Sequence, residues 1–532
     1  WSVINLKKKW YYHITILQLT HGGIEMTYLL FFIALIPIIW LMVSLGVLKM
    51  PGYKACPIGL AITILLAIIL WKMTAFDAIT ASLEGVALAL WPIIIVIIAA
   101  VFTYNLSVHT KSMDIIKKMM SNITTDKRIL VLILAWAFGG FMEAIAGFGT
   151  AVAIPASILA ALGFDPIFAA IICLIANTTP TAFGAIGIPV TTLAKVSNID
   201  VTQLSYAVGL QLLLLIIVVP IILVMITGKS VKAIKGVWGI TLASGISFAV
   251  PQVFAAKYLG AELPAILGSV ICMAVTVGIA KVFYKDTASK DVEKISAKEA
   301  VLAWLPFTLV FMFVILSSGL CPPINKALSS VKTSIQIYSG KGASPYVFNW
   351  LSTPGTLIII ATFIGGLVQG AKFSEIAGVL GNTFKQMFKS SITIIAIVAL
   401  AKVMGYSGMI KSISAVLVAT TGRFYPLIAP IIGALGTFVT GSDTSANVLF
   451  GKLQVEVARS LHLNEYWLAA ANTGGATAGK MISPQSIAVA TAATGLAGSE
   501  GEILNSTLKF CIVYVAVLGL IAYFAGPVFG FR

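Results

Sequence analysis

Long uninterrupted apolar stretches recur along this chain and constrain its fold more than any other feature. Residues 28–48, 58–71, 210–226 and 392–401 are examples, and similar stretches continue to the C-terminus. A stretch of about 20 apolar residues can cross a lipid bilayer as an α-helix. Only 10% of the 532 residues are charged, whereas soluble domains carry about 25%. The sequence therefore predicts an all-α polytopic membrane protein, with about 12–14 transmembrane segments.

The strongly basic net charge of +16 fits this class of protein. In a soluble protein it would suggest a nucleic-acid partner, but Lys and Arg also collect in the cytoplasmic loops of membrane proteins. The five Cys are scattered singly and have no His nearby, so neither a disulfide framework nor a metal site is predicted. No nucleotide-binding motif is present, so ATP-driven pumping by this chain is not expected. The sequence predicts neither a nucleic-acid partner nor a cofactor.

The N-terminal segment, residues 1–27, is unusual. Position 1 is Trp, and the first Met is Met26, directly before the first apolar stretch. Residues 1–25 are interpreted as translated upstream sequence with the start at Met26. The alternative is a genuine basic leader, because "KKKWYY" resembles the charged start of a signal peptide.

The chain contains an internal repeat. The stretches "ANTTPTAFGAIGIPV" (176–190) and "ANTGGATAGKMISPQ" (471–485) share Asn and Pro at the same spacing. Further segments align in the same order: 56–79 with 353–376, 124–128 with 420–424, and 147–151 with 441–445. The sequence therefore predicts three parts after residue 27: a first transmembrane repeat at 28–228, a linker with two spans and a charged cytoplasmic loop at 229–302, and a second repeat at 303–532.

Loop charges indicate how the two repeats are oriented. The loop at 107–128 carries five Lys and Arg, whereas its counterpart at 405–423 carries two. Because basic loops face the cytoplasm, these two loops are predicted on opposite sides, and the repeats are predicted to be inverted. Basic loops at 49–54, 229–235 and 285–299 share the cytoplasmic side. The segment 321–349 is then external, although its three Lys count against this topology.

The repeated polar stretches predict helix breaks inside the membrane. Irregular backbone is tolerated at membrane depth only where it is buried in protein or lines a water-filled cavity. Pro180 and Pro189 are expected to interrupt the first stretch, and Gly474, Gly475 and Pro484 the second. A second pair of elements, 139–155 and 433–449, is rich in small residues and is predicted to form two re-entrant hairpins. Transporters with inverted repeats use such broken helices to hold substrate.

Neutral polar residues in these elements are predicted to bind substrate. Asn177 and Thr178 pair with Asn472 and Thr473 in the repeat, which gives donors suited to a small carboxylate and a hydroxyl. The same role is predicted for Ser442, Thr444, Ser445 and Gln485. The alternative is that the Asn, Thr and Ser side chains only cap broken helices and cross-link neighbouring ones.

Ionisable residues within apolar sequence are hypotheses about function by default. Lys480 is predicted to bind an anionic substrate, with snorkelling or a pair with Asp443 as the alternative. Asp443 and Glu143 are predicted to couple transport to protons, because a carboxyl group in an apolar cavity can load and release a proton. The alternative for both is a satisfied structural carboxyl. Lys452 is interpreted as part of an interfacial charged face with Glu456 and Arg459.

Several phrases closely resemble the bacterial L-lactate permease family. They are "GFMEAIAGFGTAVAIP", "LIANTTPTAFGAIGIP", "VTGSDTSANVLFGKLQ" and "GKMISPQSIAVA", and the resemblance runs from about Met26 to the C-terminus. It implies proton-coupled import of L-lactate, and also of D-lactate or glycolate, across the bacterial cytoplasmic (inner) membrane. Thr150 stands where family members have a small apolar residue, and Lys452 where they have Ala, so substrate preference could differ from L-lactate.

The residues and the resemblance together predict a secondary transporter rather than an enzyme. Its partners would be a small monocarboxylate, H⁺ and the lipid bilayer, and a homodimer is compatible with these features. The alternative in the same class is a Na⁺-coupled carrier of another small organic acid. A channel does not need two broken helices, and a membrane enzyme needs a nucleophile or metal cluster that the sequence does not show.

Overall fold

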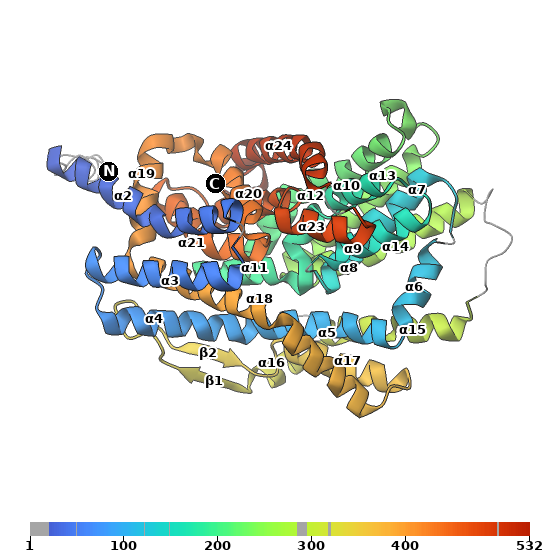
Figure 1. The fold of residues 1–532 in the computed structure, drawn as a ribbon, viewed down its shortest axis with the longest axis horizontal. Coiled ribbons are helices and arrows are strands. Elements are labelled where there is room, and N and C mark those ends of the chain that lie inside the picture. The colour runs from blue at the N-terminus through green and yellow to red at the C-terminus, as the bar shows by residue number, and fades with distance from the viewer. Residues whose placement is uncertain are drawn as a thin grey trace.

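The computed structural model describes residues 21–48, 50–121, 123–147, 149–284, 295–317, 321–496 and 499–531. Most of the predicted upstream segment, and residues 285–294 of the predicted loop at 285–299, lie outside these residues. The chain folds into long helices that run roughly along one axis, with a small two-stranded hairpin against one side (Figure 1). Strands β1 (Lys332–Ile335) and β2 (Tyr346–Asn349) pair antiparallel, with Lys332 opposite Asn349.

In its described residues, the first half of the chain contains eleven α-helices and four short helical segments of other types. The α-helices are α2 (His21–Leu41), α3 (Gly52–Ile69), α4 (Ala75–Leu88), α5 (Ile95–His109), α6 (Ser112–Ser121), α7 (Lys127–Val131), α8 (Gly139–Ile145), α9 (Thr150–Ala161), α10 (Pro166–Ala176), α11 (Gly184–Ser197) and α12 (Val201–Thr227). The other segments are the π-helical η1 (Met42–Val47), η2 (Ala89–Ile94) and η3 (Leu132–Phe138) and the 3₁₀ turn η4 (Thr179–Phe183).

Two helices, α13 (Trp238–Tyr258) and α14 (Pro264–Phe283), follow the 3₁₀ turn η5 (Val231–Ile234) and precede the second half. The second half contains α15 (Ala297–Ser317), α16 (Pro322–Ser329), α17 (Pro354–Val368), α18 (Phe373–Ser407), α19 (Met409–Thr421), α20 (Tyr425–Thr440), α21 (Asp443–Ser460), α22 (Glu465–Lys480), α23 (Pro484–Thr494) and α24 (Glu500–Phe524). The 3₁₀ turns η6 (Gly422–Phe424) and η7 (Pro527–Phe529) complete it.

The helices confirm the predicted polytopic membrane fold. Within the described residues, eleven helices are long and apolar enough to cross a bilayer, or twelve if the bent pair α10 and α11 counts as one span. Many of their large apolar side chains, such as Phe32, Ile69 and Phe283, are exposed on the outer surface. In water such exposure would be unfavourable, whereas lipid tails are a matching solvent.

The two halves present similar elements in the same order. One run of 35 residues, Ala75–His109, combines α4, η2 and α5, and a second run of 35 residues, Phe373–Ser407, is α18. The helix that follows the first run, α6, and the helix that follows the second, α19, lie at opposite ends of the long axis (Figure 1). The inverted relation of the repeats stays a prediction.

Helix breaks occur at matching places in both halves. In the first half, α8 ends at Ile145 and α9 begins at Thr150. The helices α10 and α11 are separated at 177–183, where the axis bends by 49°. In the second half, α20 and α21 are separated at 441–442, and α22 and α23 at 481–483. The first turn of α11 also contains Ala185, Ile186 and Gly187 in left-handed conformations, which turn the chain sharply because L-residues do not continue a helix there.

The predicted role of Gly474 and Gly475 as helix breakers is wrong. Both lie inside the continuous helix α22, and the break comes after Lys480, just before Pro484. A Cβ atom on Gly475 would lie 1.9 Å from the backbone oxygen of Pro430 in α20. Small residues of this kind let two membrane helices approach closely. Gly475 therefore serves the packing of α20 on α22, whereas Gly474 faces Leu518 of α24.

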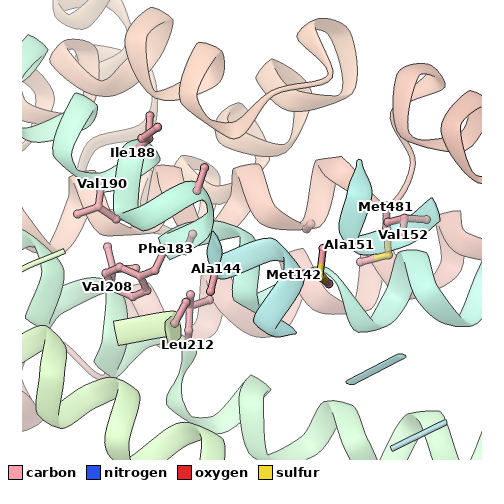
Figure 2. Packing of buried hydrophobic residues seen from close by; sticks show 14 of the residues in the cluster. Met142, Ala144, Ala151, Val152, Phe183, Ile188, Val190, Val208, Leu212 and Met481 are labelled. Carbon is pink, nitrogen blue, oxygen red and sulfur yellow. The ribbon is translucent and has the colours of Figure 1, made fainter. Parts of the chain in front are cut away.

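Apolar side chains fill the space around the first-half breaks. Figure 2 shows part of this core, with labelled residues from α8, α9, η4, α11 and α12 together with Met481 from the second half. Phe183, Met142 and Leu212 are fully or almost fully buried. This packing fixes where the polar residues beside the breaks lie.

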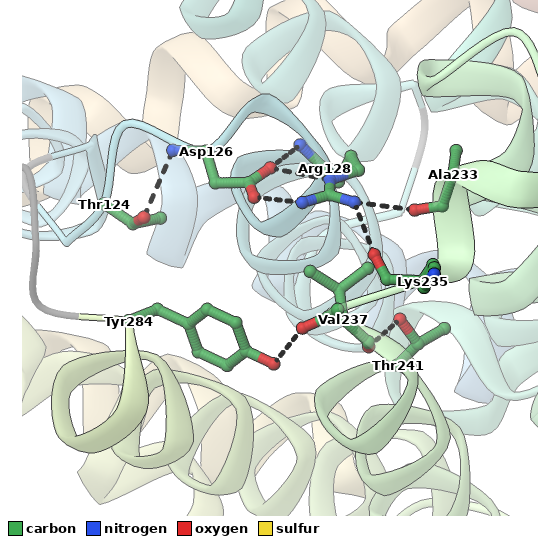
Figure 3. Close-up of polar contacts among 9 residues, drawn as sticks. Thr124, Asp126, Arg128, Ala233, Lys235, Val237, Thr241 and Tyr284 are labelled. Carbon is green, nitrogen blue, oxygen red and sulfur yellow. Dashed lines mark hydrogen bonds and ion pairs between the residues drawn. The ribbon is translucent and has the colours of Figure 1, made fainter.

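One ion-pair cluster ties α7 to the segment that leads into α13. Asp126 caps α7 by accepting a hydrogen bond from the Arg128 backbone N–H, and its carboxylate lies 2.7 Å from the Arg128 guanidinium (Figure 3). That guanidinium also donates to the backbone oxygens of Ala233 and Lys235. Burial opposes ionisation of Asp126, but the Arg128 hydrogen bonds and charge outweigh it and lower the pKa of this carboxyl.

Replacing Arg128 by alanine is expected to destabilise the folded protein by about 1–3 kcal/mol, because Asp126 and two carbonyl oxygens lose a charged donor. Thermal unfolding in detergent at neutral pH would show a lower midpoint. Since the pKa of folded Asp126 is depressed, the wild-type advantage should be present above about pH 4 and shrink as pH falls below it. Lys127→Ala is the matched control, because Lys127 is exposed. An unchanged midpoint for Arg128→Ala would contradict the assignment.

Candidate functional site

The helix breaks surround a polar cavity of about 390 Å³, here called the central cavity. Both halves contribute to its wall. Its polar and glycine lining includes Glu143, Gly147, Gly149, Thr181, Gly184, Lys389, Ser442, Asp443, Thr444, Ser445, Lys480 and Gln485. Protein cavities that bind small molecules have volumes of this order. The cavity can therefore hold a small organic ion together with some water.

An ion pair between the two halves forms one wall of the central cavity. The Lys480 Nζ atom lies 2.7 Å from Oε1 of Glu143; the Glu143 side chain is buried, and that of Lys480 is 12% exposed. The second carboxylate oxygen of Glu143 has no hydrogen-bond partner among the described residues. A Cβ atom on Gly184 would lie 2.6 Å from Oε1 of Glu143, so a glycine at this position makes room for the pair.

A second carboxyl group, that of Asp443, lies in the same wall without an ion pair. Asp443 is 3% exposed, and neither carboxylate oxygen has a hydrogen-bond partner in the described part of the chain. It is the first residue of α21, where the helix dipole favours an acidic side chain. Two carboxyl groups and two lysines, Lys389 and Lys480, therefore line the central cavity.

At least three helix N-termini also line the central cavity. They belong to α9, which begins after Gly149, to α21, which Ser442 caps, and to α23, which Ser483 caps. Unpaired N–H groups and the helix dipole make an N-terminus favourable for a negative charge. With Lys480 and Lys389 nearby, this part of the protein is suited to bind a small anion.

The structure brings seven of the predicted site residues together. Glu143, Ser442, Asp443, Thr444, Ser445, Lys480 and Gln485 all line the central cavity. Glu143 comes from α8 in the first half, and the other six come from residues 442–485 in the second half. Lys480 pairs with Glu143 instead of Asp443, the partner that the sequence analysis considered.

The four Asn and Thr residues of the repeated stretches lie outside this lining. Asn177 ends α10 and is 3% exposed, and both its amide atoms lack a hydrogen-bond partner among the described residues. Thr178 donates to the backbone oxygen of Ile175. Asn472 and Thr473 are fully buried within α22. Their predicted role in substrate binding stays a prediction.

Asn472 and Thr473 belong to a buried hydrogen-bond network. The Asn472 amide donates to Oδ1 of Asn447 at 2.9 Å and accepts from the Gln454 amide at 3.1 Å. The Asn447 amide donates to Thr473 and to the backbone oxygen of Pro189. This network, named here the Asn447 network, joins α21 to α22 and to α11.

Sequence reasoning missed several residues of the central cavity and of the Asn447 network. Thr181 and Lys389 line the cavity, and Asn447 and Gln454 organise the network. The signal for Lys389 was a lysine in the middle of a 35-residue helix that is apolar enough to span a membrane. The signal for Asn447 and Gln454 was their spacing of seven residues, which places both side chains on one face of α21.

These observations define the class of protein. Interrupted membrane helices that meet at a polar, ion-paired cavity are the architecture of a secondary membrane transporter. Sequence comparison agrees with this class. The family profile described as L-lactate permease matches residues 30–529.

Two curated relatives match most of the chain. An L-lactate permease of Streptococcus iniae is 56% identical over 82% of this chain and 93% of its own length. A glycolate permease, GlcA of Escherichia coli, is 38% identical over 96% of this chain and 97% of its own length. Among solved structures, MtrF of Neisseria gonorrhoeae is 14% identical over 87% of this chain and 94% of that chain, with a TM-score of 0.49.

The chain belongs to the L-lactate permease family. It is a multi-pass protein of the bacterial inner membrane and a transporter rather than an enzyme. The resemblance predicted from its motifs is confirmed.

Proposed function

We propose that this protein imports L-lactate, and also D-lactate or glycolate, by proton symport. The observation that carries the proposal is the ion pair between Lys480 and Glu143 in the wall of the central cavity. A substrate carboxylate can take the place of Glu143 beside Lys480. The names of the relatives, which include L-lactate and glycolate permeases, support a small 2-hydroxy acid as substrate.

The groups around Lys480 match the rest of such a substrate. Ser442, Thr444 and Ser445 at the start of α21 and Gln485 at the start of α23 offer neutral donors and acceptors to a hydroxyl group. The N-terminal ends of these helices add favourable partial charge for the carboxylate. The apolar remainder of lactate is one methyl group, so the site needs little apolar surface to accommodate it.

Competition between the substrate carboxylate and Glu143 for Lys480 supplies a mechanism for proton coupling. When a substrate carboxylate pairs with Lys480, Glu143 loses its cation while it stays buried. A buried carboxylate without a partner is strongly unfavourable, so Glu143 takes up a proton. The cavity then has the same net charge when it is loaded with one anion and one proton as when it is empty. One proton and one substrate anion therefore move together.

The predicted topology gives the direction in which the central cavity opens. Gly52 and Tyr53, from the loop predicted as cytoplasmic, line one side of it. Lys389 also lies there, with its amino group 5.3 Å from the centre of the Tyr53 ring. We therefore assign this conformation to the inward-facing state, in which substrate is released to the cytoplasm.

Uptake of labelled L-lactate into proteoliposomes tests the proposal. An inward proton gradient is expected to drive accumulation above equilibrium, and an imposed Na⁺ gradient at constant pH is not. Unlabelled D-lactate and glycolate should compete with L-lactate. Accumulation driven by Na⁺ alone would instead identify a Na⁺-coupled carrier. Absence of lactate uptake under both gradients would refute lactate as the substrate.

A further inference from the structure

A second polar cavity, of about 420 Å³, is lined by three lysines and one carboxylate. The lysines are Lys195 of α11, Lys402 of α18 and Lys452 of α21, and the carboxylate is Glu84 of α4. We name it the lysine cavity. We propose that it is a second binding site for the substrate carboxylate, at the opposite end of the transport path from the central cavity. This proposal rests on the proposed function.

Only one of the three lysines has its charge neutralised by contact. The Lys402 amino group lies 2.7 Å from Oε1 of Glu84, and the Tyr406 hydroxyl donates to the same oxygen. Lys195 and Lys452 form no ion pair within the described residues. Both lysines line the cavity, whose wall holds three lysines and one carboxylate, and the carboxyl of Glu262 acts on the charge of Lys195 from outside that lining. An anion bound in the cavity would neutralise the charges of Lys195 and Lys452.

An unused hydroxyl group lies in the same wall. Ser197 is 4% exposed, and its Oγ atom has no hydrogen-bond partner among the described residues. It lies two residues after Lys195 and lines the lysine cavity. Buried polar side chains are rarely left unpaired. Lys195, Lys452 and Ser197 therefore supply two cations and one neutral donor, a set suited to a small carboxylate.

Three helices connect the two cavities. α21 places Asp443 at the central cavity and Lys452 at the lysine cavity, about 14 Å apart along its axis. α18 does the same with Lys389 and Lys402, about 20 Å apart. α11 begins at the central cavity and carries Lys195 near its end. The two cavities therefore lie in sequence along one path through the protein.

The Asn447 network lies between the two cavities. Asn447 is fully buried, and it follows Asp443 and precedes Lys452 on α21. Its bonds to Thr473 and to the backbone oxygen of Pro189 close the space between α11, α21 and α22. In this conformation the lysine cavity is a separate compartment, so an anion there does not touch Lys480.

The lysine cavity lies on the side predicted as external. Part of its wall comes from the segment that contains β1 and β2, including Ser344 and Tyr346. Uncompensated positive charge in a recessed site raises the local concentration of anions and their rate of entry. The lysine cavity would thus capture substrate outside before the path to the central cavity opens.

Uptake kinetics of Lys452→Gln test this role. At low ionic strength the KM for L-lactate should rise by about 3–10-fold while Vmax stays within about twofold of wild type, and salt near 0.5 M should reduce the difference. Lys326→Gln is the matched control, because Lys326 is an exposed lysine of α16 that lines neither cavity. A KM for Lys452→Gln equal to that of the control, with normal wild-type uptake, would overturn this proposal alone. Absent wild-type uptake would overturn the proposed function as well.

Equilibrium binding provides a second measurement that does not depend on transport. Labelled L-lactate should still bind weakly to purified Lys480→Gln protein, because the lysine cavity is intact. Adding Lys452→Gln should remove this remaining binding. If Lys480→Gln alone removes all binding, or if the double variant still binds, the lysine cavity is not a substrate site.

Discussion

Replacing Lys480 by glutamine is expected to abolish concentrative lactate uptake. The substitution removes the only lysine that both pairs with a carboxylate and lines the central cavity, as far as the described residues show. Removing one partner of a buried charge pair costs about 2–5 kcal/mol, which corresponds to a KM increase of at least about 30-fold. Initial rates of labelled lactate uptake into proteoliposomes measure the effect.

A matched double variant separates loss of binding from loss of folding. Lys480→Gln alone leaves Glu143 buried without its cation, which itself destabilises the protein. Lys480→Gln combined with Glu143→Gln removes both charges and leaves two amides that can hydrogen-bond. The double variant should regain the thermal stability of the wild type and still fail to transport. Near-normal uptake by the double variant would show that Lys480 does not bind the substrate.

Replacing Glu143 by glutamine is expected to separate transport from the proton gradient. The amide imitates the protonated carboxyl, so Lys480 is free for substrate whether or not a proton is present. Exchange of labelled for unlabelled lactate across the membrane should persist at rates within about tenfold of wild type. Accumulation driven by a pH gradient should be lost, because no proton need enter with the anion. Both measurements use the same proteoliposomes.

Asp443→Asn is the comparison that identifies the proton carrier. Asp443 lies in the same wall but has no ion pair with Lys480. If Glu143 carries the coupling proton, Asp443→Asn should retain pH-driven accumulation, at a reduced rate where the side chain contributes to binding. If Asp443→Asn loses accumulation and Glu143→Gln retains it, the coupling proton is on Asp443 and the competition mechanism is wrong.

The apolar stretches and the helix-breaking residues predicted most of the fold. Spans follow from length and hydropathy alone, and Pro180 and Pro484 indicated two of the four breaks correctly. Gly474 and Gly475 misled the prediction because a glycine can either interrupt a helix or let another helix approach. The positions of Pro430 on α20, which faces Gly475, and of Leu518 on α24, which faces Gly474, distinguish these outcomes. Neither position can be read from the local sequence.

The candidate site was predictable in its residue types but not in its pairs. Lys480, Asp443 and Glu143 stand out as charges in apolar sequence, and the structure places all three at one cavity. Glu143 and Lys480 are 337 residues apart, so their contact depends on how the halves pack together. The lysine cavity could not be predicted from the sequence either. Its three lysines come from three different helices, and no local sequence pattern connects them.

The ion pair across the halves also bears on energy conservation. While no substrate is bound, the Lys480 amino group directly neutralises the charge of the Glu143 carboxylate. Under the proposed coupling, an empty transporter that changed conformation would carry no proton inward. The same contact that recognises an anion would then prevent futile leakage of the proton-motive force when lactate is scarce.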